Sequence, residues 1–235
     1  MLNIKTFGSG SAGNCYHISD GETDILLECG LPWKEIRQKM NFDTSRIKAV
    51  LITHEHGDHC KGLKGALAAG KNVYMSEGTK DALNVEHHRL NSVTVGKQLR
   101  IGSFMIMPFE TEHDVNEPVG FLLSTKTGDN LLFATDTYFI RHRFKGLTHI
   151  MLEVNYSLPI VDNHIANGRI PYAMKKRLVK SHMSLENAIQ FFKNQDLSKV
   201  EFIYLLHLSD TNSHKEDFIK AVQRETGKIV YAASK

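Results

Sequence analysis

The stretch THEHGDHC, residues 53–60, concentrates side chains that bind metal ions. His54 and His56 are two positions apart, and in an extended loop such positions project to the same side, so both rings can grip one ion. Asp58 and His59 then fall at the start of the next helix. There they point away from the first pair and suit a second ion a few ångströms off. The spacing therefore predicts two metal ions.

Ligands of this mixed type favour an open, catalytic site. Structural zinc sites are closed by four protein ligands, usually with cysteines, whereas a catalytic site keeps a position for water. The alternative, an exposed polar loop whose histidines are accidental, explains the order H-x-H-x-D-H at a strand end less well. The chain also holds 13 histidines in 235 residues, and histidine is the commonest side-chain metal ligand.

Further ligand-type residues follow apolar runs far along the chain. His113 comes after the run that ends at Phe109, Asp136 after LLFAT and His207 after FIYLL. Residues at strand ends can be held rigidly by the scaffold. Each histidine alone could be an ordinary core or surface residue. Together, in chain order, the three residues are predicted to complete the site begun by residues 54–59.

These residues need a framework of strands and helices. Short apolar runs between turn residues predict strands, and helical spacing predicts helices. The predicted strands cover residues 3–7, 14–19, 23–28, 49–53, 73–75, 104–109, 119–124, 131–134, 150–154 and 202–206. The predicted helices cover residues 33–40, 59–69, 78–85, 185–192 (capped by Ser184) and 214–224. Two packed sheets flanked by helices accommodate this order. No repeat or linker divides it, so we expect one domain over residues 1–235.

The composition indicates an ordinary globular protein. Apolar residues make up 41% and charged residues 23%, close to the average for such proteins. No basic segment leads into an apolar one at the N-terminus, and nowhere do roughly 18 apolar residues run uninterrupted, so we expect a cytoplasmic location and no membrane segment. Cys15, Cys29 and Cys60 form no CxxC pair and are expected to be reduced. The net charge of +3 leaves the partner open.

The motifs resemble those of a known family. HEHGDH, His113 in TEHDVNEPVGF, Asp136 in ATDTY and His207 in LHLSDTN are similar to the successive motifs of the metallo-β-lactamase superfamily, over residues 1 to about 210. GSGSAGNCY, EPVGF, SHMSLENA and HLSDTN resemble its YycJ/WalJ-like branch, whose members are associated with DNA exonuclease activity. The resemblance implies an α/β fold, the αββα four-layer sandwich, with a dinuclear site at one edge of two sheets.

The resemblance also implies a role for each ligand. The first metal would be held by His54, His56 and His113, the second by Asp58, His59 and His207, and Asp136 would bridge both. Glu28 in LLECG departs from the pattern, because the superfamily usually has aspartate there. That residue normally orients the histidine loop, and an extra methylene changes its reach. We expect the replacement to be tolerated.

A hydrolytic mechanism follows from two such ions, zinc or manganese with iron as a third candidate. Divalent ions roughly 3.5 to 4 Å apart lower the pKa of a bridging water and neutralise charge on the substrate. We expect the bridging hydroxide to attack, with Asp58 helping to position it. His182 in SHMSLEN is a candidate for contacting a phosphate or protonating the leaving group; alternatively, it is only a neighbour of a helix cap. Cys60 is expected to be a packing residue.

The substrate is less well defined. The glycine-rich GSGSAG could bind an anion through its backbone N–H groups or be only a turn. Two basic runs could attract a phosphate backbone or be solvated helix faces: Arg141, Arg143 and Lys145, and Lys175, Lys176, Arg177 and Lys180. We predict a metal-dependent phosphodiesterase, a DNA exonuclease. The alternative substrate is a small ester, lactone, thioester or cyclic nucleotide. A non-catalytic metal-bound protein and a diiron oxygen-reducing protein agree less well with the ligands, and the oligomeric state stays open.

Overall fold

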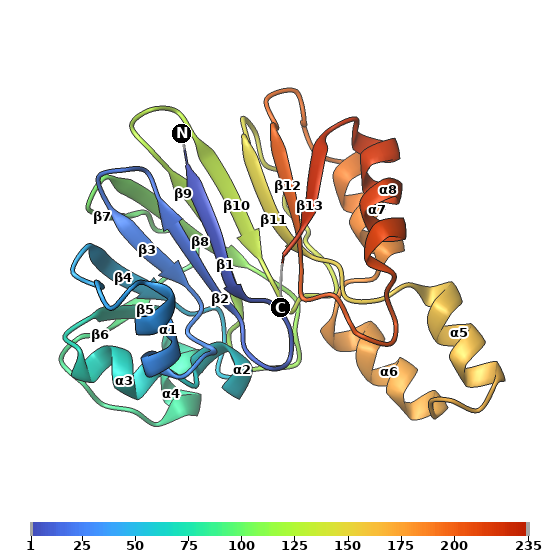
Figure 1. Cartoon of the computed structure of the whole chain (residues 1–235), viewed down its shortest axis with the longest axis horizontal. Coiled ribbons are helices and arrows are strands. Elements are labelled where there is room, and N and C mark those ends of the chain that lie inside the picture. Colours follow the sequence, from blue (N-terminus) through green and yellow to red (C-terminus); the bar gives the residue numbers. More distant parts are fainter. Residues whose placement is uncertain (1, 234–235) are drawn as a thin grey trace. The chain divides into compact units, whose positions relative to one another are not determined.

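The computed structural model describes residues 2–233, and these divide into two compact units. The first unit comprises residues 2–110 and 115–129, and the second comprises residues 111–114 and 130–233. Each unit has its own strands and helices (Figure 1). The expectation of one domain over residues 1–235 stays a prediction. Within residues 2–233, no helix has the length and apolar character needed to cross a membrane.

The first unit is built on a six-stranded sheet whose strands follow one another in chain order. Its strands are β1 (Asn3–Gly8), β2 (Cys15–Ser19), β3 (Asp24–Leu27), β4 (Ile47–Leu51), β5 (Asn72–Ser76) and β6 (Leu90–Val93). The first three correspond to the first three predicted strands and pair in antiparallel fashion. From β3 onward the strands pair in parallel, which requires a crossover between successive strands.

Four helices of the first unit supply these crossovers and cover the sheet. They are α1 (Trp33–Lys39), α2 (Gly57–Cys60), α3 (Leu63–Ala68) and α4 (Glu77–Leu83). α3 packs against α1 and β5, and α4 packs against β5 and β6. Ile36, Val50, Leu67 and Val73 belong to the buried core of this unit. Full burial of an aliphatic side chain contributes about 1.5–3 kcal/mol, so this core holds β4 firmly where it leads into residues 53–59.

Three further strands of the first unit form an antiparallel group. They are β7 (Leu99–Ile101), β8 (Phe104–Glu110) and β9 (Val119–Ser124). Along most of β8, buried and half-buried positions alternate, as expected for a strand with one face toward a core. β8 ends immediately before residues 111–114, which carry His113.

The second unit contains four parallel strands, β10 (Asn130–Ala134), β11 (His149–Glu153), β12 (Phe202–Leu206) and β13 (Ile229–Ala232). β11 is buried at all five positions, which agrees with the continuous apolar runs typical of parallel strands. The helices are α5 (Leu158–Ala166), α6 (Tyr172–Ser181), α7 (Leu185–Lys193) and α8 (Lys215–Thr226). α7 and α8 lie side by side, and α8 packs on β13 (Figure 1).

Local capping explains where α7 begins and where α8 ends. The Ser184 hydroxyl accepts a hydrogen bond from the Asn187 N–H at 3.1 Å, so the predicted cap is confirmed. α8 stops at Gly227, whose φ of 66° is accessible to glycine without strain.

Several elements differ from those predicted. The helix expected over residues 59–69 is two helices, α2 and α3, separated around Gly62. A Cβ at Gly62 would overlap the Leu31 carbonyl oxygen, so the chain needs glycine there. β6, β7, β13, α5 and α6 were not predicted. These strands have only three or four residues, and α6 is dominated by polar and exposed side chains, so hydrophobic periodicity is a weak guide to them.

Candidate metal centre

Four donors of the first unit gather where the chain runs from β4 into α2. We call His54, His56, Asp58 and His59 the first donor cluster. Nε2 of His54 lies 3.1 Å from Nδ1 of His56, and the buried ring of His59 lies 4.1 Å from that of His54 between centroids. Two nitrogens bound to one tetrahedral zinc ion, each at about 2.0–2.1 Å, are roughly 3.3 Å apart. The separation of the first two rings therefore fits one shared ion.

The start of α2 produces this arrangement. His56 is extended and forms the N-cap of α2, and its carbonyl oxygen accepts the His59 N–H at 2.9 Å. Asp58 and His59 consequently lie in the first turn of α2, as predicted, with Oδ2 of Asp58 3.5 Å from Nε2 of His59. The Thr53 hydroxyl lies 2.9 Å from Nδ1 of His54 and restrains that ring.

Glu28 lies directly behind His59. It is fully buried, and its Oε2 atom is 3.5 Å from Nδ1 of His59. The Thr53 N–H donates to its carboxylate at 3.3 Å. Burial raises the pKa of Glu28, while the adjacent His59 and Thr53 oppose that shift. The longer side chain thus still reaches the histidine loop; Glu28 itself adopts an unusual φ of 65°.

Asn14 belongs to this site, although it was not among the predicted residues. It comes from the glycine-rich turn between β1 and β2, and its side-chain amide lies 3.1 Å from Nε2 of His59. The same amide nitrogen is 3.4 Å from Oδ2 of Asp58, and the Asn14 N–H donates to the Asp58 carbonyl at 2.8 Å. The loop between β1 and β2 therefore helps to position the first donor cluster. Asn14 lies within the quoted motif GSGSAGNCY, which was the available clue.

Four donors of the second unit gather at the carboxyl ends of its parallel strands. We call Asp136, Glu153, His182 and His207 the second donor cluster; their ligand atoms all lie within 4.8 Å of one another. Asp136 follows β10, Glu153 ends β11 and His207 follows β12. Because these strands are parallel, their carboxyl ends meet at one edge of the sheet. Nδ1 of His207 lies 2.7 Å from Oδ1 of Asp136.

Glu153 is a buried carboxylate that was not predicted. Its Oε1 atom is 2.6 Å from Nδ1 of His182 and 3.4 Å from Nδ1 of His207. Its Oε2 atom accepts the N–H groups of Thr137 at 3.0 Å and Met183 at 3.2 Å. A glutamate ending the apolar run HIMLE was the only trace of it in the sequence.

His182 and His113 are two further candidate histidines of the second unit. His182 is the C-cap of α6, and it also belongs to the second donor cluster. The His113 side chain is almost fully buried, with Nδ1 3.2 Å from Oδ1 of Asp114. Its ring centroid lies 6.1 Å from that of His182. The structure therefore brings together the predicted residues His113, Asp136, His182 and His207.

The second donor cluster suits a divalent cation. Burial disfavours the charged form of His207, but Asp136 and then Glu153 outweigh it and raise its pKa to about 10. The two carboxylates thus favour positive charge at this spot. A metal ion would take the place of that proton, because imidazole binds metal only when neutral. Mixed histidine and carboxylate donors accept zinc, manganese or iron, so the residues fit the ions that the motifs predicted.

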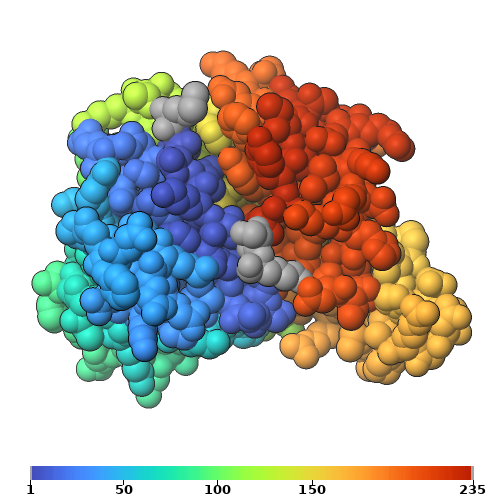
Figure 2. Space-filling model, in the orientation of Figure 1, coloured from blue at the N-terminus to red at the C-terminus, as the bar shows by residue number. Residues whose placement is uncertain are grey.

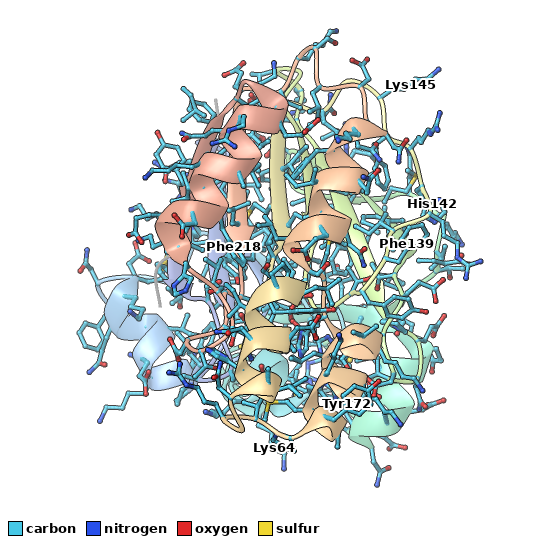
Figure 3. The ribbon with its side chains drawn as sticks, turned by 90° about the vertical axis from the view of Figure 1, so that its right-hand side faces the viewer. Lys64, Phe139, His142, Lys145, Tyr172 and Phe218 are labelled. Atoms are coloured by element: carbon cyan, nitrogen blue, oxygen red, sulfur yellow. The ribbon has the colours of Figure 1, made fainter. Side chains whose placement is uncertain are left out.

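The remaining candidate residues lie outside both clusters. Arg141, Arg143 and Lys145 lie in the segment between β10 and β11, along which Phe139, His142 and Lys145 point outward (Figure 3). Lys175 and Lys180 lie on α6. The three cysteines are free. Burial raises the pKa of the Cys60 thiol to about 11, so it is a poor nucleophile, in line with a packing role.

Comparison with known proteins agrees with these motifs. Residues 23–208 match the β-lactamase superfamily domain. Exodeoxyribonuclease YycJ of Bacillus anthracis is 28% identical over 231 residues, covering 92% of this chain and 85% of that protein. Exodeoxyribonuclease WalJ of Streptococcus pneumoniae serotype 2 is 28% identical over 233 residues, covering 92% of this chain and 84% of that protein. The metallo-β-lactamase fold protein YhfI from Bacillus subtilis is similar in structure, with a TM-score of 0.73 at 15% identity over 100% of this chain and 97% of that one.

This chain belongs to the β-lactamase superfamily. It has the metallo-β-lactamase fold, which confirms the fold class predicted from the sequence. The resemblance to the YycJ/WalJ-like branch is also confirmed. The protein is accordingly a metal-dependent hydrolase.

Proposed function

We propose that this protein is a phosphodiesterase that uses two divalent metal ions to degrade DNA from its ends. The observation that carries the proposal is the pair of donor clusters in a chain related over 92% of its length to two exodeoxyribonucleases. Hydrolysis of a phosphodiester needs neutralisation of charge on the phosphate oxygens. A site of histidines and carboxylates that holds cations meets that need. We also expect the protein to work in the cytoplasm, where DNA would be available.

We assign the ligands as the family resemblance implies. His54, His56 and His113 would hold the first ion, Asp58, His59 and His207 would hold the second, and Asp136 would be shared. The 3.1 Å separation of the first two rings supports the first group. The nearness of Asp58 to His59 and of Asp136 to His207 supports the others. Zinc and manganese are the proposed metals, with iron as a third candidate.

Each group then has a distinct task. Two divalent ions, when bound, lower the pKa of water and neutralise charge developing on the phosphate. Asp58 lies in the first turn of α2, where its carboxylate can orient the attacking water. Glu28 and Asn14 hold His59 in position through the contacts described above. No serine or cysteine nucleophile is required.

We propose that His182 donates a proton to the leaving oxygen. Its Nδ1 atom faces Glu153 at 2.6 Å, which leaves Nε2 for the substrate. Burial would lower the pKa of His182, but Glu153 and Asp136 outweigh it and raise that pKa above its ordinary value. A histidine held protonated beside the ligands is suited to act as a general acid.

The central test is degradation of end-labelled DNA by the purified protein with Mn²⁺ or Zn²⁺. Asp58→Ala should lower the rate by about 100-fold or more, because loss of a ligand removes several kcal/mol of transition-state stabilisation. Asp81→Ala is the matched control, since Asp81 is an exposed carboxylate on α4 of the same unit. Covalently closed circular DNA should resist an exonuclease.

Two outcomes would overturn the proposal. Equal degradation by wild type and Asp58→Ala would show that a contaminant cleaves the DNA. Inactivity toward DNA together with turnover of a chromogenic ester, lactone, thioester or cyclic nucleotide would instead establish the small-substrate alternative.

A further inference from the structure

α6 lies on the surface of the second unit with little burial. Of its ten residues only Ser181 is buried, and Tyr172, Met174 and Val179 expose 60%, 40% and 43% of their surface. With α5 it stands out from the rest of the unit (Figures 1 and 2). Most helices in proteins are stabilised by burying one face. α6 therefore presents a largely uncovered face to solvent.

This part of the chain also carries an unusual concentration of positive charge. Residues 158–181, which span α5 and α6, contain five lysines or arginines and one aspartate, a net charge of +4. The whole chain has a net charge of +3, so everything outside these 24 residues sums to −1. The aspartate, Asp162, pairs with Lys175. The other cations, Arg169, Lys176, Arg177 and Lys180, remain exposed.

Two of these cations follow Tyr172 along one face of α6. At 100° per residue, Lys176 and Lys180 lie about 40° and 80° around the helix axis from Tyr172, and Arg177 lies about 60° beyond Lys180. The Lys176 ammonium lies 5.5 Å from the centre of the Tyr172 ring, which agrees with that geometry. Leu178, which is half-buried, lies on the opposite side of the helix. The exposed face is thus a row of cations that begins with an aromatic ring.

α6 is joined at its far end to the second donor cluster. His182 follows its last residue, and its ring centroid lies 5.3 Å from that of His207. The Ser181 hydroxyl bonds Asp114 at 2.9 Å, and Asp114 contacts His113. Any ligand that follows the cationic face of α6 is therefore led to His182.

We propose that α6 is a docking arm for the phosphate backbone of the DNA substrate. The inference rests on the proposed nuclease function and adds the surface that holds the uncleaved part of the strand. A helix rises 1.5 Å per residue, so Lys180, Lys176 and Tyr172 lie about 3, 9 and 15 Å from His182 along the axis. Phosphates of one strand of B-DNA repeat about every 3.4 Å. The row, about 12 Å long, thus spans roughly three to four such repeats along the duplex axis.

An anionic lipid surface fits α6 less well. A helix that lies in a membrane interface separates an apolar face from a charged face. On α6 the exposed Tyr172 and Val179 share their side with Lys176, and Leu178 is already half-buried. This arrangement favours binding of a polyanion with stacked bases over insertion among lipid acyl chains.

The test compares two triple variants on duplex DNA. Lys176→Gln, Arg177→Gln and Lys180→Gln together should raise KM for DNA at least tenfold. Each phosphate contact contributes about 0.9 to the slope of log affinity against log salt. Between 50 and 200 mM salt, the affinity of this variant for DNA should therefore fall by a factor roughly 40 times smaller than the factor for wild type. The matched control removes Lys215, Lys220 and Arg224 from α8 in the same way, where all three are exposed. It should behave like wild type.

Three further measurements separate the possible failures. Fluorescence anisotropy of labelled DNA without metal measures DNA binding alone. Turnover of bis(p-nitrophenyl) phosphate measures hydrolysis at the metal site independently of the docking arm. If wild type degrades DNA and the α6 variant has the same KM and salt slope, the docking-arm proposal is wrong and the proposed nuclease function is supported. If DNA binds through α6 but only the small phosphodiester is cleaved, the proposed nuclease function is wrong and the docking-arm proposal is supported. Binding of α6 to phosphatidylserine vesicles but not to DNA would overturn the arm in favour of a lipid surface.

Discussion

Glu153 connects four groups of the second unit through two carboxylate oxygens. One oxygen faces Nδ1 of His182, and the other accepts backbone N–H groups from Thr137 and Met183. Burial alone would raise the pKa of Glu153, but the charge and hydrogen bonds of His182 and His207 keep its pKa below the ordinary value. Glu153 therefore stays ionised and both orients His182 and favours its protonated form.

At this scale we predict the effect of Glu153→Gln on turnover. The amide keeps the shape but removes the charge, so kcat for DNA should fall about 10–100-fold. Since the carboxylate raises the pKa of His182, its loss lowers that pKa. The alkaline limb of the pH–rate profile, where the proton donor is lost, should move to lower pH.

Substrates with different leaving groups check the same prediction. A p-nitrophenolate leaving group needs no proton, so the defect should be much smaller on bis(p-nitrophenyl) phosphate than on DNA. Glu225→Gln is the control, because Glu225 pairs with Lys193 between α7 and α8. A uniform defect on both substrates with an unchanged pH profile would mean that Glu153 only supports the fold.

At the scale of elements, close backbone contacts hold α2 against the loops that follow β1 and β3. The Asp58 carbonyl accepts the Asn14 N–H, and the Gly30 N–H donates to the Asn14 carbonyl at 2.8 Å. A Cβ at Gly30 would overlap the Asp58 carbonyl oxygen. Backbone cannot yield as a flexible side chain can, so glycine is needed for this approach.

We therefore expect Gly30→Ala to destabilise the protein by about 3 kcal/mol, the upper end of the usual range for overpacking. For a chain of this length that corresponds to a fall in Tm of roughly 6–12 °C. Gly57→Ala is the control, because a Cβ there meets open space and the residue needs no positive φ. Thermal melts followed by circular dichroism measure both; a Gly30→Ala protein as stable as Gly57→Ala would contradict the packing argument.

At the scale of the whole molecule, the proposed ligands come from both compact units. A ligand that binds only the folded state stabilises it by RT ln(1 + [L]/Kd), about 2.7 kcal/mol at one hundred times Kd. The ions should therefore stabilise the complete fold as well as supply chemistry.

Metal addition to chelator-treated protein should consequently raise Tm by roughly 5–10 °C. Asp136→Ala should lose most of that gain, since Asp136 is the proposed shared ligand. Lys220→Gln, an exposed change on α8, should keep it. Calorimetry with added Mn²⁺ or Zn²⁺ gives the shift, and elemental analysis gives the number of ions. An unchanged Tm in wild type would contradict ion binding by the folded chain.

Much of the candidate site was predictable because its rules are local. The spacing of His54 and His56 predicts that their rings face one ion, and their facing nitrogens lie 3.1 Å apart. Asp58 and His59 lie at the start of α2, as predicted. The strand ends before Asp136 and His207 were equally visible as apolar runs followed by a polar residue. Local capping likewise defined the start of α7.

The motif residues, most of the strands and the superfamily can be read from the amino-acid sequence. The partners that support the motif residues depend on the tertiary fold. Glu153 contacts His207 because β11 and β12 pair in parallel with Glu153 beside Leu206, and no pattern along either strand expresses that register. Asn14 meets His59 across 45 positions of the chain. Such contacts depend on how strands and loops pack. Packing brings together residues whose separation in the sequence follows no regular period.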